Sequence, residues 1–208
     1  MFAGEARIYP ITDVGLSGLS HAQQVTLLSD GGATLIQLRE KHLPPRDFYK
    51  QAEEALRVAR KRGVRILIND RVDIALALKA DGVHLGQGDL PPSAARRLLG
   101  DQAIIGLSTH NMEQACRATS LPIDYLAIGP IFATSSKGNA DPVVGLEGLR
   151  QARKTVGRIS LVAIGGISQE QVSQVLVAGA DAVAVIGAIL ANPQEIVTRM
   201  RGFLGSSR

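Results

Sequence analysis

The stretch from Ile66 to Asp89, ILINDRVDIALALKADGVHLGQGD, contains two short apolar runs joined by a helix-like segment. Both runs stop on polar groups, the first at Asn69-Asp70 and the second at Gln87 and Asp89. Apolar runs rich in β-branched residues, alternating with segments of helical spacing, are typical of buried parallel strands and their covering helices. The repeating unit of the fold is therefore expected to be one strand followed by one helix.

The same alternation continues in both directions along the chain. Helical spacing of apolar residues recurs, for example, in residues 45–63 and 168–180, and glycines close several of these segments. The expected strands are 7–13, 34–39, 65–69, 82–85, 103–107, 125–129, 160–164 and 182–186.

Eight strands, each followed by a helix, predict an α/β fold of the (β/α)8 TIM-barrel type. We expect a single compact domain spanning 1–208. The alternative is an open, doubly wound sheet. That fold often begins with a GxGxxG turn, whereas the first expected strand here runs into PITDVGLSG.

Composition limits the class of protein. No run of 18 residues is apolar and free of charge, so no membrane span is expected. The start, MFAGEARIYPITD, has no apolar stretch of the kind found in signal peptides. The single cysteine, Cys116, precludes an intramolecular disulfide and fits a reducing cytoplasm.

The charge balance favours small anionic partners. Net charge is +4 and the pI is about 9.5, but aromatic residues make up only 3% and tryptophan is absent. Base-stacking surfaces for nucleic acid are thus poorly supplied, and many basic residues fall on expected helix faces. We expect anionic metabolites as ligands and no nucleic acid; the sequence does not indicate an oligomeric state.

Active sites of (β/α)8 barrels gather at the carboxyl ends of the strands. The second strand ends in QLREK, where Gln37, Arg39 and Lys41 alternate and would share one face of an extended chain. Inward-facing polar and cationic groups are costly unless they meet a polar or anionic ligand. An ion pair from Arg39 to a carboxylate of a neighbouring strand is the alternative.

Asp70 and Asp89 end the third and fourth strands. Two carboxylates form the sparse oxygen set with which proteins hold Mg²⁺ when substrate phosphates and waters complete its octahedron. The alternatives are a helix cap for Asp70 and a turn for Asp89. The neighbouring cationic segment favours a metal bound with a pyrophosphate.

The fifth strand ends in GLSTH, which offers Ser108 as a donor to phosphate, or as a helix cap. His110 is expected to have a surface or capping role, and His84 to be a hydrogen-bonded barrel residue. His21 and His42 are expected in loops. No His and Cys spacing suggests zinc.

The loop after the sixth strand, GPIFATSSKGNADPVVG, carries Thr134, Ser136 and Lys137 and is long enough for a lid over phosphate. The seventh and eighth strands end at Gly166 and at Ile186-Gly187, where backbone N–H groups can approach an anion. Close backbone packing is the alternative for these glycines. Two anion sites are therefore expected, one assisted by metal and one built from backbone.

These motifs together resemble the thiamine-phosphate synthase family. The resemblance runs from about Tyr9 to Ile189, in family order, through YPITD, QLREK, INDRVDIALALKADGVHLGQGD, GLSTH, DYLAIGPIFATSSK, VVGLEGL and AIGGI. It implies a (β/α)8 barrel that joins 4-amino-5-hydroxymethyl-2-methylpyrimidine diphosphate to hydroxyethylthiazole phosphate, or its carboxylated form, and releases pyrophosphate. It also implies Mg²⁺ as cofactor and these two small molecules as partners.

The resemblance further implies roles for individual residues. Lys41, Ser108 and Lys137 are expected to be catalytic, as donors to the diphosphate, and Asp70 and Asp89 to be Mg²⁺ ligands. The expected substrate-binding residues are Gln37, Arg39, Lys41, Asn69, Ser108, Thr134, Ser136, Lys137, Gly166, Ile186 and Gly187. The family usually has threonine at position 136 and often serine at position 187, so Ser136 and Gly187 are departures that bear on affinity for thiazole phosphate.

The expected chemistry is departure of pyrophosphate, a methylene cation stabilised by the aminopyrimidine, and capture of that cation by the thiazole nitrogen. It needs no protein nucleophile. Thiazole tautomerases of the same fold are the alternative, but they carry a catalytic histidine where Pro130 stands. An isomerase or epimerase, and a binding protein without catalysis, are further rivals.

Overall fold

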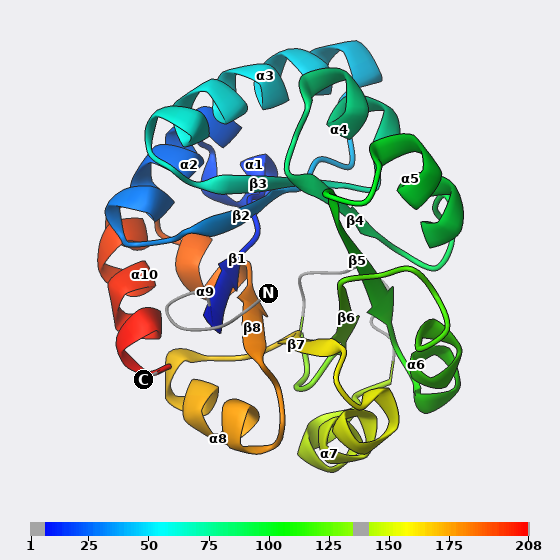
Figure 1. Cartoon of the computed structure of the whole chain (residues 1–208). Coiled ribbons are helices and arrows are strands. Elements are labelled where there is room, and N and C mark those ends of the chain that lie inside the picture. Colours follow the sequence, from blue (N-terminus) through cyan, green and yellow to red (C-terminus); the bar gives the residue numbers. More distant parts are fainter. Residues whose placement is uncertain (1–6, 135–141, 208) are drawn as a thin grey trace.

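The structure is a computed structural model that describes residues 7–134 and 142–207. Eight parallel strands alternate with helices, which surround them as an outer ring (Figure 1). The strands are β1 (Ile8–Pro10), β2 (Leu35–Leu38), β3 (Arg65–Asn69), β4 (Gly82–Leu85), β5 (Ile104–Thr109), β6 (Tyr125–Ile128), β7 (Ser160–Ile164) and β8 (Ala182–Val185).

The sheet closes on itself. Its order is β1-β8-β7-β6-β5-β4-β3-β2, and the two remaining edges meet through a parallel bridge between Ile11 and Gln37. At this seam the Thr12 N–H donates to the Gln37 carbonyl at 2.9 Å. The predicted (β/α)8 barrel is confirmed, and the open-sheet alternative is wrong.

Five strands have boundaries that differ from those expected, and the difference exceeds one residue in β1 and β5. β1 is shorter than predicted because Asp13 already accepts a hydrogen bond from the Leu16 N–H and caps helix α1 (Val14–Ser17). β5 extends two residues further, to Thr109, whose backbone partner in β6 is Ile128. Strand ends depend on cross-strand partners, so short-range patterns place them poorly.

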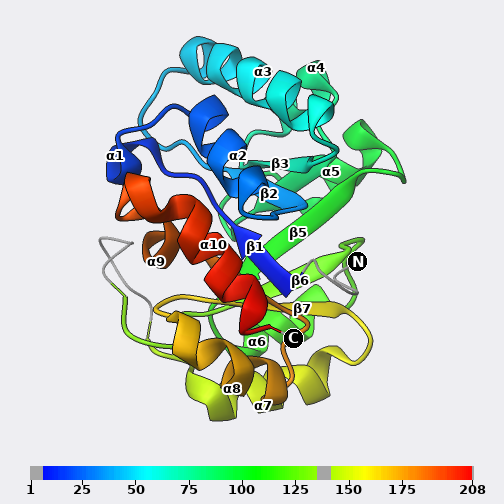
Figure 2. The same cartoon turned by 90° about the vertical axis from the view of Figure 1, so that its left-hand side faces the viewer.

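Helices cover the outside of the barrel. The α-helices after α1 are α2 (His21–Asp30), α3 (Pro45–Lys61), α4 (Val72–Leu78), α5 (Pro92–Leu99), α6 (Met112–Ala118), α7 (Gly145–Val156), α8 (Val172–Val177), α9 (Gly187–Leu190) and α10 (Ile196–Gly205). The last helix, α10, lies beside α2 and completes the ring, while the short helices α1 and α9 lie together at one end of the barrel (Figure 2). None of the described helices is long and apolar enough to cross a membrane.

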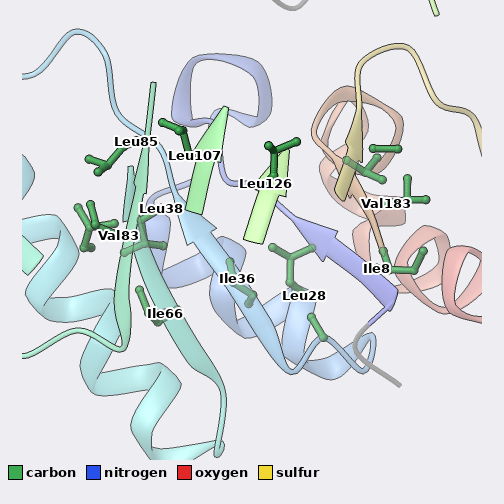
Figure 3. Packing of buried hydrophobic residues seen from close by; sticks show 14 of the residues in the cluster. Ile8, Leu28, Ile36, Leu38, Ile66, Val83, Leu85, Leu107, Leu126 and Val183 are labelled. Carbon is green, nitrogen blue, oxygen red and sulfur yellow. The ribbon is translucent and has the colours of Figure 1, made fainter. Parts of the chain in front are cut away.

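The core has two layers because alternate residues of each strand point to opposite faces. The outward-facing residues, such as Ile36, Ile66, Val83 and Leu126, pack with the helices in one large cluster (Figure 3). The inward-facing residues form a second cluster inside the barrel. Burial on both faces explains why the strand sequences are almost continuously apolar.

Two tyrosines are the largest residues of the barrel interior. The rings of Tyr9 and Tyr125 meet edge to face with centroids 5.9 Å apart. Gly106 makes room for this arrangement, since a Cβ atom there would lie 2.0 Å from Cζ of Tyr125. The barrel interior therefore carries phenol groups below the strand ends where chemistry is expected.

The opposite end of the barrel contains a hydrogen-bonding arrangement that occurs three times. An aspartate just before an even-numbered strand accepts a hydrogen bond from the N–H at the start of the preceding strand. The pairs are Asp81 with Ile66, Asp124 with Ile105 and Asp181 with Leu161, each at 2.7 Å. Arginines on α5 and α7 add ion pairs to two of them, Arg96 to Asp124 and Arg153 to Asp181. Polar residues at this end thus stabilise the fold.

Candidate active site

The carboxyl ends of β2 to β5 bring the predicted polar residues to one mouth. Parallel pairing sets Gln37 beside Leu67, Asn69 beside His84, and Leu85 beside Leu107. Residues that follow these strands therefore leave the barrel at the same end. The convergence expected from the fold class is present.

In the QLREK segment, Gln37 lies in the barrel interior, whereas Arg39 and Lys41 lie at its rim. Gln37 is buried, and its Nε2 donates to the Tyr9 hydroxyl at 2.8 Å. Arg39 and Lys41 come after the end of β2. The Arg39 guanidinium lies 2.9 Å from Asp13, and the Lys41 ammonium donates to Asp70. The ion-pair alternative for Arg39 is thus present in this structure, with a carboxylate from the end of β1.

Asp70 and Asp89 lie next to one another. Burial is the main cause of a raised pKa at the Asp89 carboxyl, and a hydrogen bond with Asp70 raises this pKa further. Asp70 has a positive φ of 61° and does not cap α4, whose N-cap residue is Arg71. Asp89 accepts from the Gly86 N–H at 2.7 Å, so its turn-forming role is real. Adjacent carboxyl groups beside a lysine are a suitable site for a hard cation.

The two carboxylates have few further ligands around them. Among residues 7–134 and 142–207, no group of three or more His, Cys, Asp or Glu side chains is arranged to hold a metal ion. A cation at Asp70 and Asp89 would therefore need oxygens from substrate or water. Mg²⁺ is commonly held in this way.

Ser108 is held from below by a histidine. The Oγ atom of Ser108 lies 2.8 Å from Nε2 of His84, and Nδ1 of His84 lies 2.8 Å from the Tyr125 hydroxyl. The helix-cap alternative for Ser108 is wrong, because the N-cap of α6 is Asn111. The expectation that His84 is a hydrogen-bonded barrel residue is confirmed.

A cavity of about 260 Å³ opens at the ends of β5 to β8. Of the predicted residues, Ser108, Thr134, Gly166, Ile186 and Gly187 line it. His110 also lines this cavity, with Nδ1 3.1 Å from the Gly129 carbonyl. A purely surface role for His110 is therefore wrong.

The cavity and the acidic pair occupy different parts of the mouth. Gln37, Arg39, Lys41, Asn69, Asp70 and Asp89 do not line the cavity. Ser108, at the end of β5, connects the two regions. This arrangement fits the expectation of two anion sites, although Ser136 and Lys137 lie outside the described residues.

Gly166 is packed more tightly than an open phosphate cradle requires. Its φ is +67°, and a Cβ atom there would lie 2.4 Å from the Ala133 carbonyl oxygen and 2.7 Å from that of Phe132. The close-packing alternative therefore holds at Gly166, where the end of β7 meets the loop after β6. The residue also lines the cavity, so both readings apply to it.

Residues 8–189 match the family described as thiamine monophosphate synthase. The chain belongs to this family. The match covers the whole barrel from β1 to α9, including both regions of the mouth.

Individual relatives agree with this membership. A thiamine-phosphate synthase of Chloroflexus aurantiacus is 47% identical over 186 residues, covering 89% of this chain and 85% of that protein. One of Clostridium novyi is 46% identical over 187 residues, covering 89% and 91%. The solved thiamine phosphate pyrophosphorylase of Pyrococcus furiosus has a TM-score of 0.86 at 34% identity, covering 98% of this chain and 96% of that one. The chain is accordingly an enzyme, a transferase of thiamine biosynthesis.

Sequence reasoning missed several polar residues of this thiamine monophosphate synthase barrel. Tyr9 and Tyr125 sit in apolar runs and were expected only as strand residues, yet their hydroxyls are 2.9 Å apart in the interior. The prediction of a loop position for His21 is wrong. It begins α2, is fully buried, and bonds Thr12 through Nδ1 at 2.7 Å. For the two tyrosines, a polar atom inside an otherwise apolar run was the available signal.

Proposed function

We propose that this chain condenses 4-amino-5-hydroxymethyl-2-methylpyrimidine diphosphate with hydroxyethylthiazole phosphate, or its carboxylated form, to give thiamine phosphate and pyrophosphate. The observation that carries the proposal is the meeting of Lys41, Asp70 and Asp89 beside a cavity at the strand ends. A cation and two acids suit a metal diphosphate, and the neighbouring cavity suits the second substrate.

We assign the Mg²⁺ site to Asp70 and Asp89. Their carboxylates are adjacent, and the pKa of Asp89 is raised by burial and by the neighbouring acid, a situation that a bound cation would relieve. When bound, Mg²⁺ would neutralise charge on the departing pyrophosphate. Lys41, already paired with Asp70, is positioned to donate to the same diphosphate.

Asn69 and Gln37 would hold the pyrimidine. The Nδ2 atom of Asn69 is buried and has no hydrogen-bond partner among the described residues. A buried donor without an acceptor is costly, so a ligand atom is expected to accept a hydrogen bond from this Nδ2 group. Nitrogen acceptors of an aminopyrimidine ring would do so. Gln37 enters the mouth from the adjacent strand β2.

The thiazole phosphate would occupy the cavity at β5 to β8. Backbone N–H groups near Gly166 and Ile186-Gly187 would bind its phosphate, in the region where (β/α)8 barrels often hold phosphate. Thr134 lines the same cavity. Ser136, two residues further along the chain, would contribute to the same site.

The protein's contribution is to position and to stabilise charge. Lys41, Ser108 and Lys137 would donate to the diphosphate oxygens as the C–O bond breaks. The cavity would hold the thiazole nitrogen against the pyrimidine methylene carbon. No side chain has to act as a nucleophile, and only small molecules are required as partners. The single cysteine, Cys116, is consistent with the reducing cytoplasm, which we propose as its location.

The other functions fit less well. Pro130 occupies the position where a thiazole tautomerase has its catalytic histidine, and it lines the cavity. An isomerase or epimerase would not require Lys41 beside two acids. A binding protein without catalysis would be expected to have lost Asp70, Asp89 or Lys137, and all three are present.

A direct assay tests the proposal. Purified protein is incubated with both substrates and Mg²⁺, and thiamine phosphate and pyrophosphate are followed by mass and by a coupled reaction. Equal amounts of the two products are expected, with loss of both in EDTA and recovery when Mg²⁺ is restored. Formation of neither product by folded protein would refute the function.

A further inference from the structure

Five side chains form a continuous hydrogen-bonded chain across the barrel interior. Gln37 Nε2 donates to Tyr9 at 2.8 Å, the Tyr9 and Tyr125 hydroxyls are 2.9 Å apart, and Tyr125 lies 2.8 Å from His84 Nδ1. His84 Nε2 then lies 2.8 Å from Ser108 Oγ. The chain joins the proposed pyrimidine contact on β2 to the proposed diphosphate contact on β5, and its members come from five different strands.

Counting donors and acceptors from Gln37 onward shows one direction in which every link of this chain has a donor and an acceptor. The amide nitrogen of Gln37 can only donate, so the Tyr9 oxygen accepts and its own proton is available to Tyr125. Tyr125 can then donate to Nδ1 of His84. A neutral imidazole that accepts at Nδ1 carries its proton on Nε2, and this N–H donates to Ser108 Oγ. The Ser108 hydroxyl proton is left for an acceptor outside the chain.

The surroundings hold this arrangement in place. Burial raises the pKa of both Tyr9 and Tyr125 far above the ordinary tyrosine value, so both phenols keep the protons they donate. The His84 ring stacks on Tyr125 with centroids 5.5 Å apart and 24° between the planes. Gly106 leaves the space that the Tyr125 ring fills. Hydrogen bonds in series also polarise one another inside a barrel of low dielectric.

We propose that His84 is a positioning residue, which accepts a hydrogen bond from Tyr125 and donates one to Ser108. The Ser108 hydroxyl is thereby oriented to donate its proton to an anionic oxygen of the substrate. The identity of that oxygen, on the pyrimidine diphosphate, rests on the proposed function. The direction of the chain does not, since it concerns only side chains that are already in contact. In the opposite direction, Ser108 would donate its proton to His84 and would meet an anion with lone pairs alone.

The first test reads the histidine directly. Nitrogen NMR of ¹⁵N-labelled, ligand-free protein near neutral pH should show His84 with a protonated Nε2 and an unprotonated Nδ1. The His84 signals are identified by their loss in His84→Gln. Tyr125→Phe should abolish this preference. A protonated Nδ1 in the wild-type protein would overturn the proposal, whatever the enzyme catalyses.

The second test uses kinetics and a double-mutant cycle. Tyr125→Phe keeps the ring and is expected to raise KM for the pyrimidine diphosphate about 5- to 10-fold, with KM for thiazole phosphate within about twofold. In a Ser108→Ala background the same change should add less than about twofold, because its effect passes through Ser108. Tyr49→Phe, which removes a hydroxyl on α3 directed at Glu53, is the matched control and should change neither constant.

The remaining outcomes are also decisive. Additive losses in the double variant, or equal losses for both substrates, would overturn the role assigned to His84. If Tyr125→Phe does not fold, Tyr9→Phe breaks the chain one link earlier and should show the same pattern with a smaller effect. A wild-type protein that keeps the Nε2–H tautomer but makes no thiamine phosphate would refute the proposed function and support the hydrogen-bond direction.

Discussion

The Nη1 atom of Arg39 lies 2.9 Å from Oδ2 of Asp13, across the seam where β1 meets β2. Both side chains are partly buried. Arg39 therefore has a carboxylate partner within the chain. Its two possible roles, as an ion-pair partner and as a diphosphate ligand, predict different effects of mutation.

The double variant Asp13→Asn/Arg39→Gln separates these roles. If Arg39 binds substrate, Arg39→Gln should raise KM for the pyrimidine diphosphate about tenfold whether or not Asp13 is charged. Asp13→Asn keeps a side-chain oxygen to cap α1 and should have a much smaller effect. Steady-state kinetics of the four proteins measure this. Recovery of wild-type KM in the double variant would leave Arg39 with a structural role alone.

Removing either acid of the proposed metal site should cripple the enzyme without unfolding it. Asp70→Asn and Asp89→Asn are each expected to lower kcat at least about 100-fold and to weaken Mg²⁺ binding, measured by calorimetry with Mg²⁺ alone. Asp73→Asn, an exposed acid in the first turn of α4, is the control and should bind Mg²⁺ normally. Unchanged Mg²⁺ binding by the Asp70→Asn/Asp89→Asn protein would exclude this site.

Gly166 and Gly63 form a natural pair of controls for backbone packing. Both have a φ of +67°, but a Cβ atom would meet backbone oxygens at Gly166 and nothing within 4 Å at Gly63. Gly63→Ala should cost about 1 kcal/mol of unfolding free energy, from the backbone conformation alone. Gly166→Ala should cost about 3 kcal/mol and should raise KM for thiazole phosphate. Urea unfolding gives both values; equal costs would contradict the packing seen here.

His21 makes stability depend on pH. Burial lowers the pKa of this imidazole from 6.5 to about 4, with Glu40 and Asp13 opposing the shift. The unfolded chain therefore binds more protons than the folded one between these values, so stability falls as pH drops from about 6.5 toward 4. The expected loss is about 2 kcal/mol between pH 7 and pH 4.5.

The variant His21→Gln isolates this contribution. Urea unfolding at pH 7 and pH 4.5 should show a smaller pH-dependent loss in His21→Gln than in the wild-type protein, by about 2 kcal/mol. His42→Gln, at an exposed position after β2, serves as the control and should follow the wild type. The same pH dependence in all three proteins would show that His21 does not titrate as described.

His110 tests whether acid-base catalysis is needed. It lines the cavity, so His110→Ala is expected to raise KM for thiazole phosphate a few-fold while kcat stays within about tenfold. Loss of a required general acid or base would typically cost 100-fold or more. An electron-withdrawing substituent on the pyrimidine should by contrast slow the reaction severely. A crippled His110→Ala enzyme that is indifferent to the substituent would favour the isomerase class.

The strand and helix pattern follows from local sequence. Near-continuous apolar runs ending at Asn69 and Leu85 predicted β3 and β4 at their observed bounds, because a strand buried on both faces leaves a short-range signature. The proximity of Asp70 to Asp89 could also be predicted, because each follows one of these two strands. Neighbouring parallel strands bring their carboxyl ends together, so adjacency in the chain becomes adjacency in space.

Only the tertiary structure decided which polar groups bond across the barrel. Tyr9 and Tyr125 are 116 positions apart, and nothing local indicates that their hydroxyls bond to each other. Closure of the sheet between β1 and β2 likewise gives Arg39 the carboxylate of Asp13. These contacts depend on strand register and on which way each side chain turns. Both are set by packing of the whole interior, because a buried polar group must find its partner wherever the closed barrel provides one.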